Sequence, residues 1–282
     1  MRNFTLNIRG RLVSFDRPAV MGILNVTPDS FFAGSRSMSE GEIESRVTRM
    51  LSEGADIIDI GACSTRPGSE SVGAGEELDR LARGMKVVRR LAPDIPVSVD
   101  TFRAEVAHVA VNDLGCDIVN DISGGLIDPE MPDTVAALHC PYILMHMRGT
   151  PDTMQKLTDY GDMGVTAAVI AELQQAVRRF TLAGVSDIII DPGFGFAKTV
   201  EQNYTMMAQL RQFGIFGLPI LVGISRKSMI TKALGIPTDE ALNATSVLNA
   251  FALDRGADIL RVHDVRAAAQ AVALHRLVID NQ

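Results

Sequence analysis

Polar side chains stand at the ends of eight short apolar runs in this sequence. The runs end at Asn25, Asp59-Ile60-Gly61, Asp100, Asn120-Asp121, Met145-His146, Asp191, Gly223-Ile224-Ser225 and Arg261-Val262-His263. Cations gather at or near these ends, namely Arg66, Arg226, Lys227, Arg261 and His263. In a chain whose net charge is −7, this placement suggests a local site for a small anionic ligand.

The intervals between the runs mostly fit a helix, which is typical of parallel strands whose carboxyl ends meet at one site. We expect strands at 19–25, 57–61, 97–100, 118–122, 142–147, 188–191, 220–223 and 259–262. The runs are almost continuously apolar, as in parallel strands covered on both faces. Apolar residues at helical spacing predict helices at 40–53, 76–91, 104–112, 131–138, 164–182, 201–213, 228–234, 239–254 and 265–279.

This pattern predicts an α/β fold, specifically a (β/α)8 TIM barrel with an N-terminal β-hairpin. Residues 5–8 and 12–14 flank Arg9-Gly10-Arg11 and would form the hairpin, which could close the bottom of the barrel. A barrel of this type uses about 250 residues, so we expect residues 1–282 to form a single domain. An open doubly wound sheet is the alternative, but no glycine fingerprint of the dinucleotide-binding type is present.

Composition narrows the possible partners and compartment. A pI near 5.3 argues against a general surface for nucleic acid or anionic membranes. Three widely spaced cysteines without a C-x-x-C pair argue against a disulfide framework or zinc site and favour a reducing cytoplasm. No signal peptide is visible, and no apolar run approaches the roughly 18 residues that span a bilayer.

Five motifs occur in order along the chain: Asn25-Val26-Thr27-Pro28-Asp29-Ser30-Phe31, Ser64-Thr65-Arg66-Pro67-Gly68, Asp191-Pro192-Gly193-Phe194-Gly195-Phe196, Ser225-Arg226-Lys227-Ser228 and Arg261-Val262-His263-Asp264-Val265. Each alone could be a polar loop or a helix cap. Together they closely resemble the dihydropteroate synthases, from about Ala19 to the last helix. The resemblance implies a transferase of folate biosynthesis that joins 6-hydroxymethyl-7,8-dihydropterin diphosphate to p-aminobenzoate and releases diphosphate.

The resemblance also implies a role for individual residues. It places the pterin against Asp100, Asn120, Met145, Asp191, Gly223 and Lys227. It assigns the diphosphate to Asn25, Thr65, Arg66, Arg261 and His263. It lines the p-aminobenzoate pocket with Phe31, Arg66, Pro67, Phe196, Ser225 and Lys227. The catalytic set would be Asn25, Asp100, Asp191, Lys227, Arg261 and His263.

The chemistry of the residue types is consistent with these roles. Carboxylates and an amide on strand ends can match the donors and acceptors of a pterin edge, since unpaired buried polar groups are costly. The resemblance implies Mg²⁺ against the diphosphate and Asn25, and without a carboxylate cage the metal should arrive with the substrate. An arylamine is neutral at pH 7, so we assign the aspartates to recognition and cation stabilisation rather than to proton abstraction.

Further expectations concern residues outside this set. We expect His146 to make a structural hydrogen bond, and Cys63 not to act as a nucleophile because no base partner is evident. The family is usually dimeric through its late helices, so a homodimer is expected. The family is also a sulfonamide target.

Two positions depart from the family pattern, and two alternative functions remain open, of which the departures motivate the second. The first loop has Ala33, and the end of the second strand has Cys63, where the family usually has carboxylates. These losses affect loop closure and sulfonamide response more than the pterin pocket. The alternatives are a pterin-binding methyltransferase, whose substrate lacks a diphosphate, and a non-catalytic pterin-binding paralogue.

Overall fold

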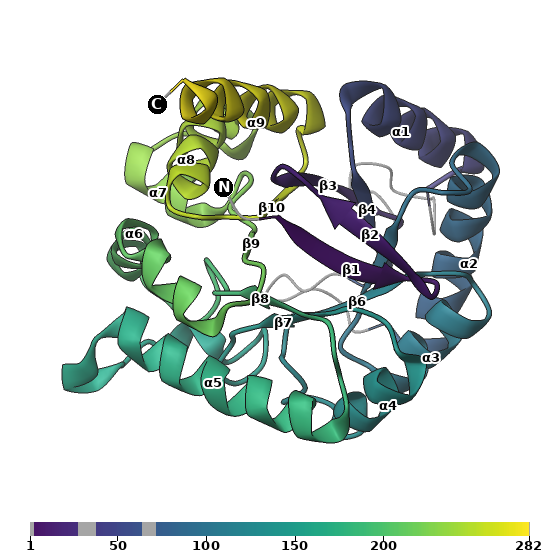
Figure 1. Ribbon diagram of the computed structural model, residues 1–282, viewed down its shortest axis with the longest axis horizontal. Coiled ribbons are helices and arrows are strands. Elements are labelled where there is room, and N and C mark those ends of the chain that lie inside the picture. Colours follow the sequence, from purple (N-terminus) through teal and green to yellow (C-terminus); the bar gives the residue numbers. More distant parts are fainter. Residues whose placement is uncertain (1–2, 28–37, 64–71, 282) are drawn as a thin grey trace.

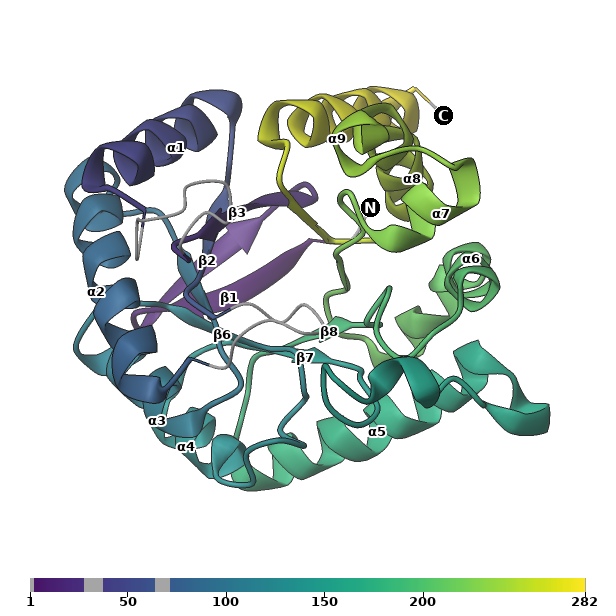
Figure 2. The same cartoon turned by 180° about the vertical axis from the view of Figure 1, so that it is seen from behind.

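A ring of parallel strands surrounded by helices forms the centre of the protein, seen from its two sides in Figure 1 and Figure 2. The computed structural model describes residues 3–27, 38–63 and 72–281. The strands of the ring are β3 (Ala19–Asn25), β4 (Ile57–Gly61), β5 (Val97–Asp100), β6 (Ile118–Asp121), β7 (Tyr142–Met145), β8 (Ile188–Asp191), β9 (Leu221–Val222) and β10 (Ile259–Val262). Their order is β8-β7-β6-β5-β4-β3-β10-β9.

The two outer strands of this order meet and close the ring. A parallel bridge joins Ile190 of β8 to Ile220, the residue before β9. Each of the other neighbours along the ring is a parallel pair. The predicted (β/α)8 barrel is therefore confirmed, with all carboxyl ends at the same rim.

Helices alternate with the strands and cover the outside of the ring (Figure 1). They are α1 (Glu40–Glu53), α2 (Ala74–Leu91), α3 (Ala104–Asn112), α4 (Met131–Leu138), α5 (Val165–Ala183), α6 (Val200–Ala208), α7 (Ser228–Leu234), α8 (Leu242–Asp254) and α9 (Val265–Asp280). Local signals fix several ends. Ser39 and Glu42 form a capping box before α1, and Gly54 ends that helix in the left-handed conformation.

Two predicted helices are shorter than expected. The segment predicted at 201–213 is α6 followed by a 3₁₀ helix at Leu210–Phe216, which contains Gly214 and ends at Gly217. Glycine disfavours a continuous α-helix there. The segment predicted at 239–254 begins as a 3₁₀ turn at Thr238–Ala241, and α8 starts only at Leu242.

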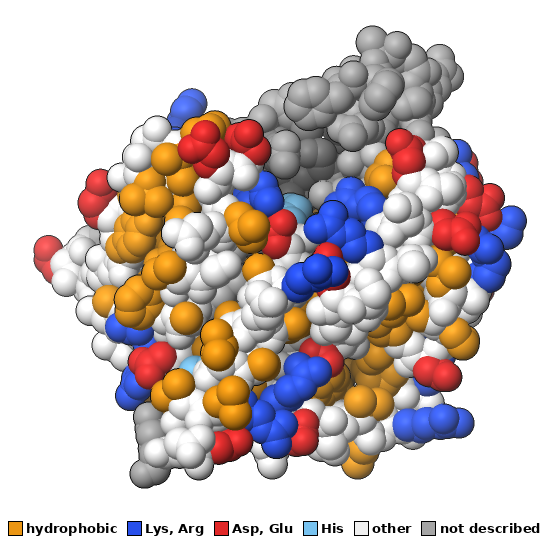
Figure 3. All heavy atoms as spheres, turned by 90° about the horizontal axis from the view of Figure 1, so that it is seen from above, with side chains coloured by type: hydrophobic (Ala, Val, Ile, Leu, Met, Phe, Trp, Pro, Cys, Tyr) orange, Lys and Arg blue, Asp and Glu red, His pale blue; other side chains and the backbone are white. Residues whose placement is uncertain are grey.

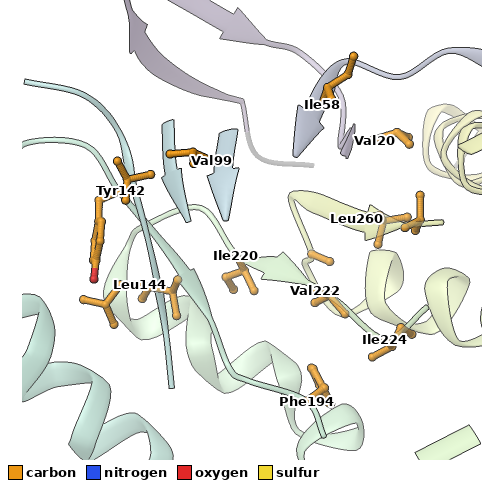
Figure 4. Close-up of a cluster of buried hydrophobic side chains, with 14 of the residues drawn as sticks. Val20, Ile58, Val99, Tyr142, Leu144, Phe194, Ile220, Val222, Ile224 and Leu260 are labelled. Carbon is orange, nitrogen blue, oxygen red and sulfur yellow. The ribbon is translucent and has the colours of Figure 1, made fainter. Parts of the chain in front are cut away.

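The barrel has an outer and an inner apolar core. The outer core lies between the strands and the helices, where Figure 4 shows Val20, Ile58, Val99, Val222 and Leu260 among its buried side chains. These residues alternate with inward-facing ones because successive side chains of a strand point to opposite faces. A helix-covered barrel therefore needs nearly every strand position to be buried.

The inner core fills only the amino-terminal half of the barrel and is covered by the hairpin. The hairpin consists of β1 (Phe4–Ile8) and β2 (Arg11–Phe15), which lie across the ring in Figure 1. Buried residues of β1 pack in one cluster with the first inward-facing residues of the strands, which are Ala19, Met21, Ile57, Ile118, Ile143, Ile189, Leu221 and Ile259. The hairpin closes the bottom of the barrel, as the sequence suggested.

Polar contacts fasten the hairpin to the strands below it. Arg9 pairs with the buried Asp117, with Nε 2.6 Å from Oδ1. The backbone N–H of Asn7 donates to Asp187 Oδ2 at 2.7 Å. Arg17, just after the hairpin, pairs with Asp56. Because all three acceptors stand directly before barrel strands, namely β6, β8 and β4, the contacts align the hairpin with the ring.

No helix within the described ranges is long and apolar enough to cross a membrane.

The hairpin cluster predicts a contrast between two leucines. Leu6 is 1 % exposed within the cluster, whereas Leu12 is 77 % exposed. Leu6→Ala should lower the free energy of unfolding by about 2 to 4 kcal/mol because it leaves a cavity in packed surroundings. Leu12→Ala should change it by less than about 0.5 kcal/mol. Urea denaturation checks both, and equal effects would contradict the proposed packing.

Candidate active site

The inward-facing positions change from apolar to polar midway along the strands. On five strands an apolar residue of the lower cluster is followed two positions later by a polar residue or glycine: Ile57 by Asp59, Ile118 by Asn120, Ile189 by Asp191, Leu221 by Gly223 and Ile259 by Arg261. The period of two places both residues of each pair on the inner face. A polar layer therefore lies directly above the apolar core, at the carboxyl ends where barrel enzymes have their sites.

Arg261 occupies the centre of this polar layer. Its Nε donates to Asp59 Oδ2 at 2.6 Å, and its Nη2 donates to Asp100 Oδ2 at 2.5 Å. Asn120 Nδ2 lies 3.3 Å from both oxygens of Asp59. Asp59 is completely buried, whereas the side chains of Asp100 and Arg261 keep 15 % and 20 % of their surface exposed. The cluster therefore joins β4, β5, β6 and β10 and reaches the open side.

Burial and neighbouring charges act in opposite directions on this cluster. Burial raises the pKa of Asp100 to about 7, and Arg261 opposes that rise. Burial lowers the pKa of Arg261, but Asp59 and Asp100 outweigh it and raise that pKa above the ordinary value. The guanidinium therefore stays charged and compensates the two carboxylates.

Asp191 lies across the pocket from Asp100, next to Gly223. Its Oδ1 accepts from the Gly193 N–H at 2.8 Å. A Cβ built on Gly223 would lie 3.9 Å from Asp191 Oδ2 and 3.8 Å from Arg261 Cβ. Because Gly223 has no side chain, only backbone lies between the two charged groups at this position. Burial raises the pKa of Asp191, whereas the charge of Lys227 lowers it.

Lys227 reaches the same pocket from the loop after β9. Its Nζ donates to the Phe194 carbonyl at 2.5 Å and lies 4.6 Å from the centre of the Phe196 ring. Gly195 has a φ of +82°, and a Cβ there would come within 3.2 Å of Lys227 Cδ. Burial lowers the pKa of Lys227 to about 8, although Asp191 raises it. The lysine is mostly charged at neutral pH.

His263 and Ser225 lie side by side on the neighbouring strand ends. Ser225 Oγ accepts from the His263 backbone N–H at 3.1 Å and lies 3.1 Å from His263 Nδ1. Burial, followed by the charge of Arg261, lowers the pKa of His263 to about 4. The imidazole is therefore neutral at pH 7 and can serve a ligand as a hydrogen-bond donor.

Arg226 belongs to the scaffold and not to the open pocket. It has a φ of +55°, an unusual conformation for a residue with a side chain. Its guanidinium pairs with both oxygens of Asp264, at 2.8 and 2.9 Å. The pair fixes the loop that carries Ser225 and Lys227 against the strand that carries His263.

Asn25 ends β3, which lies between β10 and β4 in the ring. A Cβ built on Gly61 would lie 3.6 Å from Asn25 Oδ1 and 3.7 Å from Asp100 Oδ2, so the two polar groups flank this glycine. Within residues 3–27, 38–63 and 72–281, no group of three or more histidine, cysteine or acidic side chains could hold a metal. The amide oxygen of Asn25 is of the ligand type that hard cations accept.

An apolar patch adjoins the polar layer on the side of β7. It contains the buried Ile122, Met145, Met147, Met154 and Ala197, with the partly buried Phe102, Ile127 and Phe196 packed against it. Met145 is the inward residue above Ile143, at the level of the polar layer. A flat ring could thus contact a methionine side chain while its edge contacts polar groups.

Most predicted site residues lie together at this carboxyl-terminal rim of the barrel. The structure places Asn25, Asp100, Asn120, Met145, Asp191, Phe196, Gly223, Ser225, Lys227, Arg261 and His263 there. Phe31, Thr65, Arg66 and Pro67 lie outside the described residues. Cys63, Cys116 and Cys140 are all described, and none forms a disulfide.

Sequence reasoning missed two buried charges beside the pocket. Asp59 was noted only as the end of a run, although the alternation Ile57, Asp59, Gly61 places it on the inner face. Lys198 was not singled out. It lies 4 % exposed behind the loop that ends in Phe196, with Nζ 3.0 Å from His146 Nδ1. No local pattern pairs two residues 52 positions apart.

Comparisons with known proteins agree with this geometry. A sequence model described as "Pterin binding enzyme" matches residues 21–263. The dihydropteroate synthase of Synechocystis sp. is 47% identical over 90% of this chain and 88% of its own length. A Yersinia pestis dihydropteroate synthase, solved as a sulfonamide drug complex, has a TM-score of 0.90 at 36% identity and covers 99% of this chain and 100% of its own.

A third similar protein was solved with a small ligand. The dihydropteroate synthase of Xanthomonas albilineans with 4-aminobenzoic acid has a TM-score of 0.88 at 36% identity, covering 98% of each chain. These identities extend over nearly the whole length of each protein, so they concern the complete barrel. The chain therefore belongs to the pterin binding enzymes and, among them, to the dihydropteroate synthase family of transferases.

Proposed function

We propose that the protein condenses 6-hydroxymethyl-7,8-dihydropterin diphosphate with p-aminobenzoate to give 7,8-dihydropteroate and diphosphate. The observation that carries the proposal is the convergence of Asp100, Asn120, Asp191 and Lys227 with Arg261 in one pocket. Such a set supplies acceptors and donors for a heterocycle beside a cation for a phosphate. The relatives named above support the assignment.

The pterin would lie between the carboxylates, over Met145. The open oxygens of Asp100 and Asp191 can accept from its amino group and ring N–H, whereas Asn120 and Lys227 can donate to its acceptor atoms. Each of these protein groups is already held by a neighbour, such as the Gly193 N–H on Asp191. Because the donors and acceptors are fixed in advance, little order is lost when the ligand binds.

The diphosphate would lie toward Arg261 and His263. Arg261 uses Nε and Nη2 for Asp59 and Asp100, and its Nη1 has no partner among the described residues. That nitrogen can donate to a phosphate oxygen while the pairs with the carboxylates persist. The neutral imidazole of His263 can donate a second hydrogen bond.

Leaving-group stabilisation then accounts for catalysis. The bond between the pterin methylene carbon and the diphosphate oxygen breaks, and both electrons leave with diphosphate. The carbocation is delocalised into the pterin ring next to Asp100 and Asp191. The arylamine lone pair forms the new C–N bond, and the nitrogen then releases a proton. The proximity and charge of the fixed groups lower the barrier, and no strong base is needed.

The p-aminobenzoate would occupy the outer part of the pocket. Phe196 offers an apolar wall, and Ser225 with Lys227 offers polar contacts for the carboxylate. The relative from Xanthomonas albilineans was solved with the same compound. We expect sulfonamides to compete for this position, in keeping with the complex of the Yersinia pestis relative.

Mg²⁺ fits the residues present and is part of the proposal. Asn25 would hold it together with diphosphate oxygens and water, a shell that suits a hard cation. The ion would neutralise charge that develops on the leaving group.

A turnover assay tests the function directly. With both substrates and Mg²⁺ we expect dihydropteroate and diphosphate in equal amounts, and a chelator should suppress both. Turnover equal to buffer would favour a non-catalytic paralogue. If diphosphate had no effect on the fluorescence of a bound pterin, a methyltransferase would be the better account.

Asp191→Asn should weaken pterin binding about tenfold or more, because an acceptor becomes a mismatched amide in a buried site. Fluorescence titration with 6-hydroxymethylpterin measures the effect. Asp162→Asn, on an exposed 3₁₀ turn, is the matched control and should bind normally. Normal affinity in the Asp191 variant would contradict its assignment.

Arg261→Ala should weaken binding of the pterin diphosphate ester more than binding of the free pterin, because the phosphate loses the cation that it contacts. It also leaves Asp59 and Asp100 without their shared partner, which costs stability and some pterin affinity. Asp59→Asn in the Arg261→Ala background should restore part of the pterin affinity but not the preference for the ester. Equal loss of both ligands in that double variant would mean that Arg261 does not bind the diphosphate.

We also propose a homodimer formed through the late helices. Exposed hydrophobic side chains lie on α8 and α9, namely Val247, Phe251, Leu274, Leu277 and Val278. Figure 3 shows hydrophobic side chains gathered in a band on the side of the molecule where these helices lie. Patches of this kind commonly mark protein interfaces. Light scattering that gave a monomer mass at micromolar concentration would contradict the proposal.

A further inference from the structure

The loop after β8 is folded around one buried ammonium group. Lys198 Nζ lies 3.0 Å from the Gly193 carbonyl and 2.9 Å from the Phe196 carbonyl, both in the same loop. A third contact, at 3.0 Å, joins Nζ to His146 Nδ1 at the end of β7. His146 Nε2 in turn lies 3.0 Å from Glu172 Oε2 on α5. One lysine thus ties the loop to two other elements.

A single assignment of protons satisfies all of these contacts. The protonated amine has three donors, which match two carbonyls and an unprotonated Nδ1. Burial lowers the pKa of Lys198 to about 7, and the charge of Asp191 opposes that fall, so the charged form is fully present only below neutral pH. The Nε2–H of His146 then donates to Glu172, whose charge is also paired with Arg148. Burial, followed by the charge of Lys198, lowers the pKa of His146 to about 4, so this imidazole is neutral at pH 7. In the opposite tautomer Nε2 would carry no proton, and two acceptors, Nε2 and the Glu172 carboxylate, would face each other.

The loop that Lys198 holds turns sharply, through three residues with positive φ. Gly193, Gly195 and Ala197 all have positive φ, at +72°, +82° and +51°. A Cβ at Gly193 would come within 1.9 Å of the His146 carbonyl oxygen, so the loop is pressed against the end of β7. Ala197 carries a side chain in this rare conformation, which persists only where surrounding contacts fix it. One such contact is the Tyr160 hydroxyl, which donates to the Ala197 carbonyl at 3.0 Å.

The same loop carries the two groups that orient Lys227. The Phe194 carbonyl accepts from Lys227 Nζ, and the Phe196 ring lies beneath that ammonium. Phe196 also provides one of the two carbonyls bound by Lys198. A chain of direct contacts therefore leads from Lys198 through the loop to Lys227. Lys198 itself lies behind this loop, 4 % exposed.

We propose that Lys198 is a positioning residue, whose hydrogen bonds to the loop and to His146 set the orientation of Lys227 for the pterin. This inference rests on the proposed contact between Lys227 and the pterin. The alternative is that Lys198 contributes only to general stability. The two differ in what they predict when Lys227 is absent.

A double-mutant cycle separates the two. Lys198→Met keeps the length of the side chain and removes its donors, so it should weaken binding of 6-hydroxymethylpterin about tenfold. In a Lys227→Met background the same change should have almost no further effect, because residues that act through one contact are not additive. Lys232→Met, on the exposed surface of α7, should leave affinity unchanged. Fluorescence titration gives all the affinities.

Two variants of His146 test the contact between His146 and Lys198 without removing the lysine. The Oδ1 of asparagine lies near the position of Nδ1 and can still accept from Lys198, whereas glutamine reaches toward Glu172 and leaves the lysine without its third acceptor. We expect His146→Asn to keep most of the pterin affinity and His146→Gln to lose about tenfold. This pair decides the question even if Lys198→Met does not fold.

Three results would overturn the inference. They are normal affinity in Lys198→Met, losses that multiply in the double variant, and equal losses in the two His146 variants. Lys227→Met tests the underlying assignment separately. If Lys227→Met alone binds pterin normally, the proposed contact with Lys227 fails, and the positioning role fails with it. If it binds weakly but the losses multiply, only the positioning role fails.

Discussion

The burial of two carboxylates around one guanidinium is the interaction on which the site depends. Asp59 and Asp100 face each other inside the barrel, where each charge would be costly alone. Arg261 compensates both, and Asn120 approaches Asp59 from β6, on the far side of β5. These contacts link strands that are distant in sequence. Arg261 therefore both compensates the buried charges of the polar layer and shapes the site. A change that removed one of these roles would also remove the other.

The alternation of strand residues made most of this arrangement predictable. An apolar residue followed two positions later by a polar one indicates a filled lower layer and a polar upper layer, as at Ile189 and Asp191. Strand ends in a barrel must share a rim, so residues as distant as Asp100 and Arg261 could be placed together from the sequence. The helices that deviated contain glycine or begin with 3₁₀ turns, for which hydrophobic periodicity is a poor guide.

Contacts between side chains that are distant in the chain could not be predicted from the sequence. Arg226 was counted among the cations of an anion site, but it pairs with Asp264 and supports the scaffold. Lys198 appeared as one more residue after a glycine-rich motif, yet it makes three contacts out of reach of solvent. Sequence patterns indicate which face a residue occupies. They do not indicate which of several charges on that face will be neutralised.

The hairpin affects how small molecules can enter and leave the barrel. Among the residues that the structure describes, Phe4, Leu6 and Ile8 cover the amino-terminal end of the barrel with buried apolar side chains. Reactants and products would then enter and leave at the carboxyl-terminal rim. A molecule bound near the rim would block the exit of a molecule bound deeper in the barrel. A bulky compound at the rim can therefore inhibit without touching the reacting atoms.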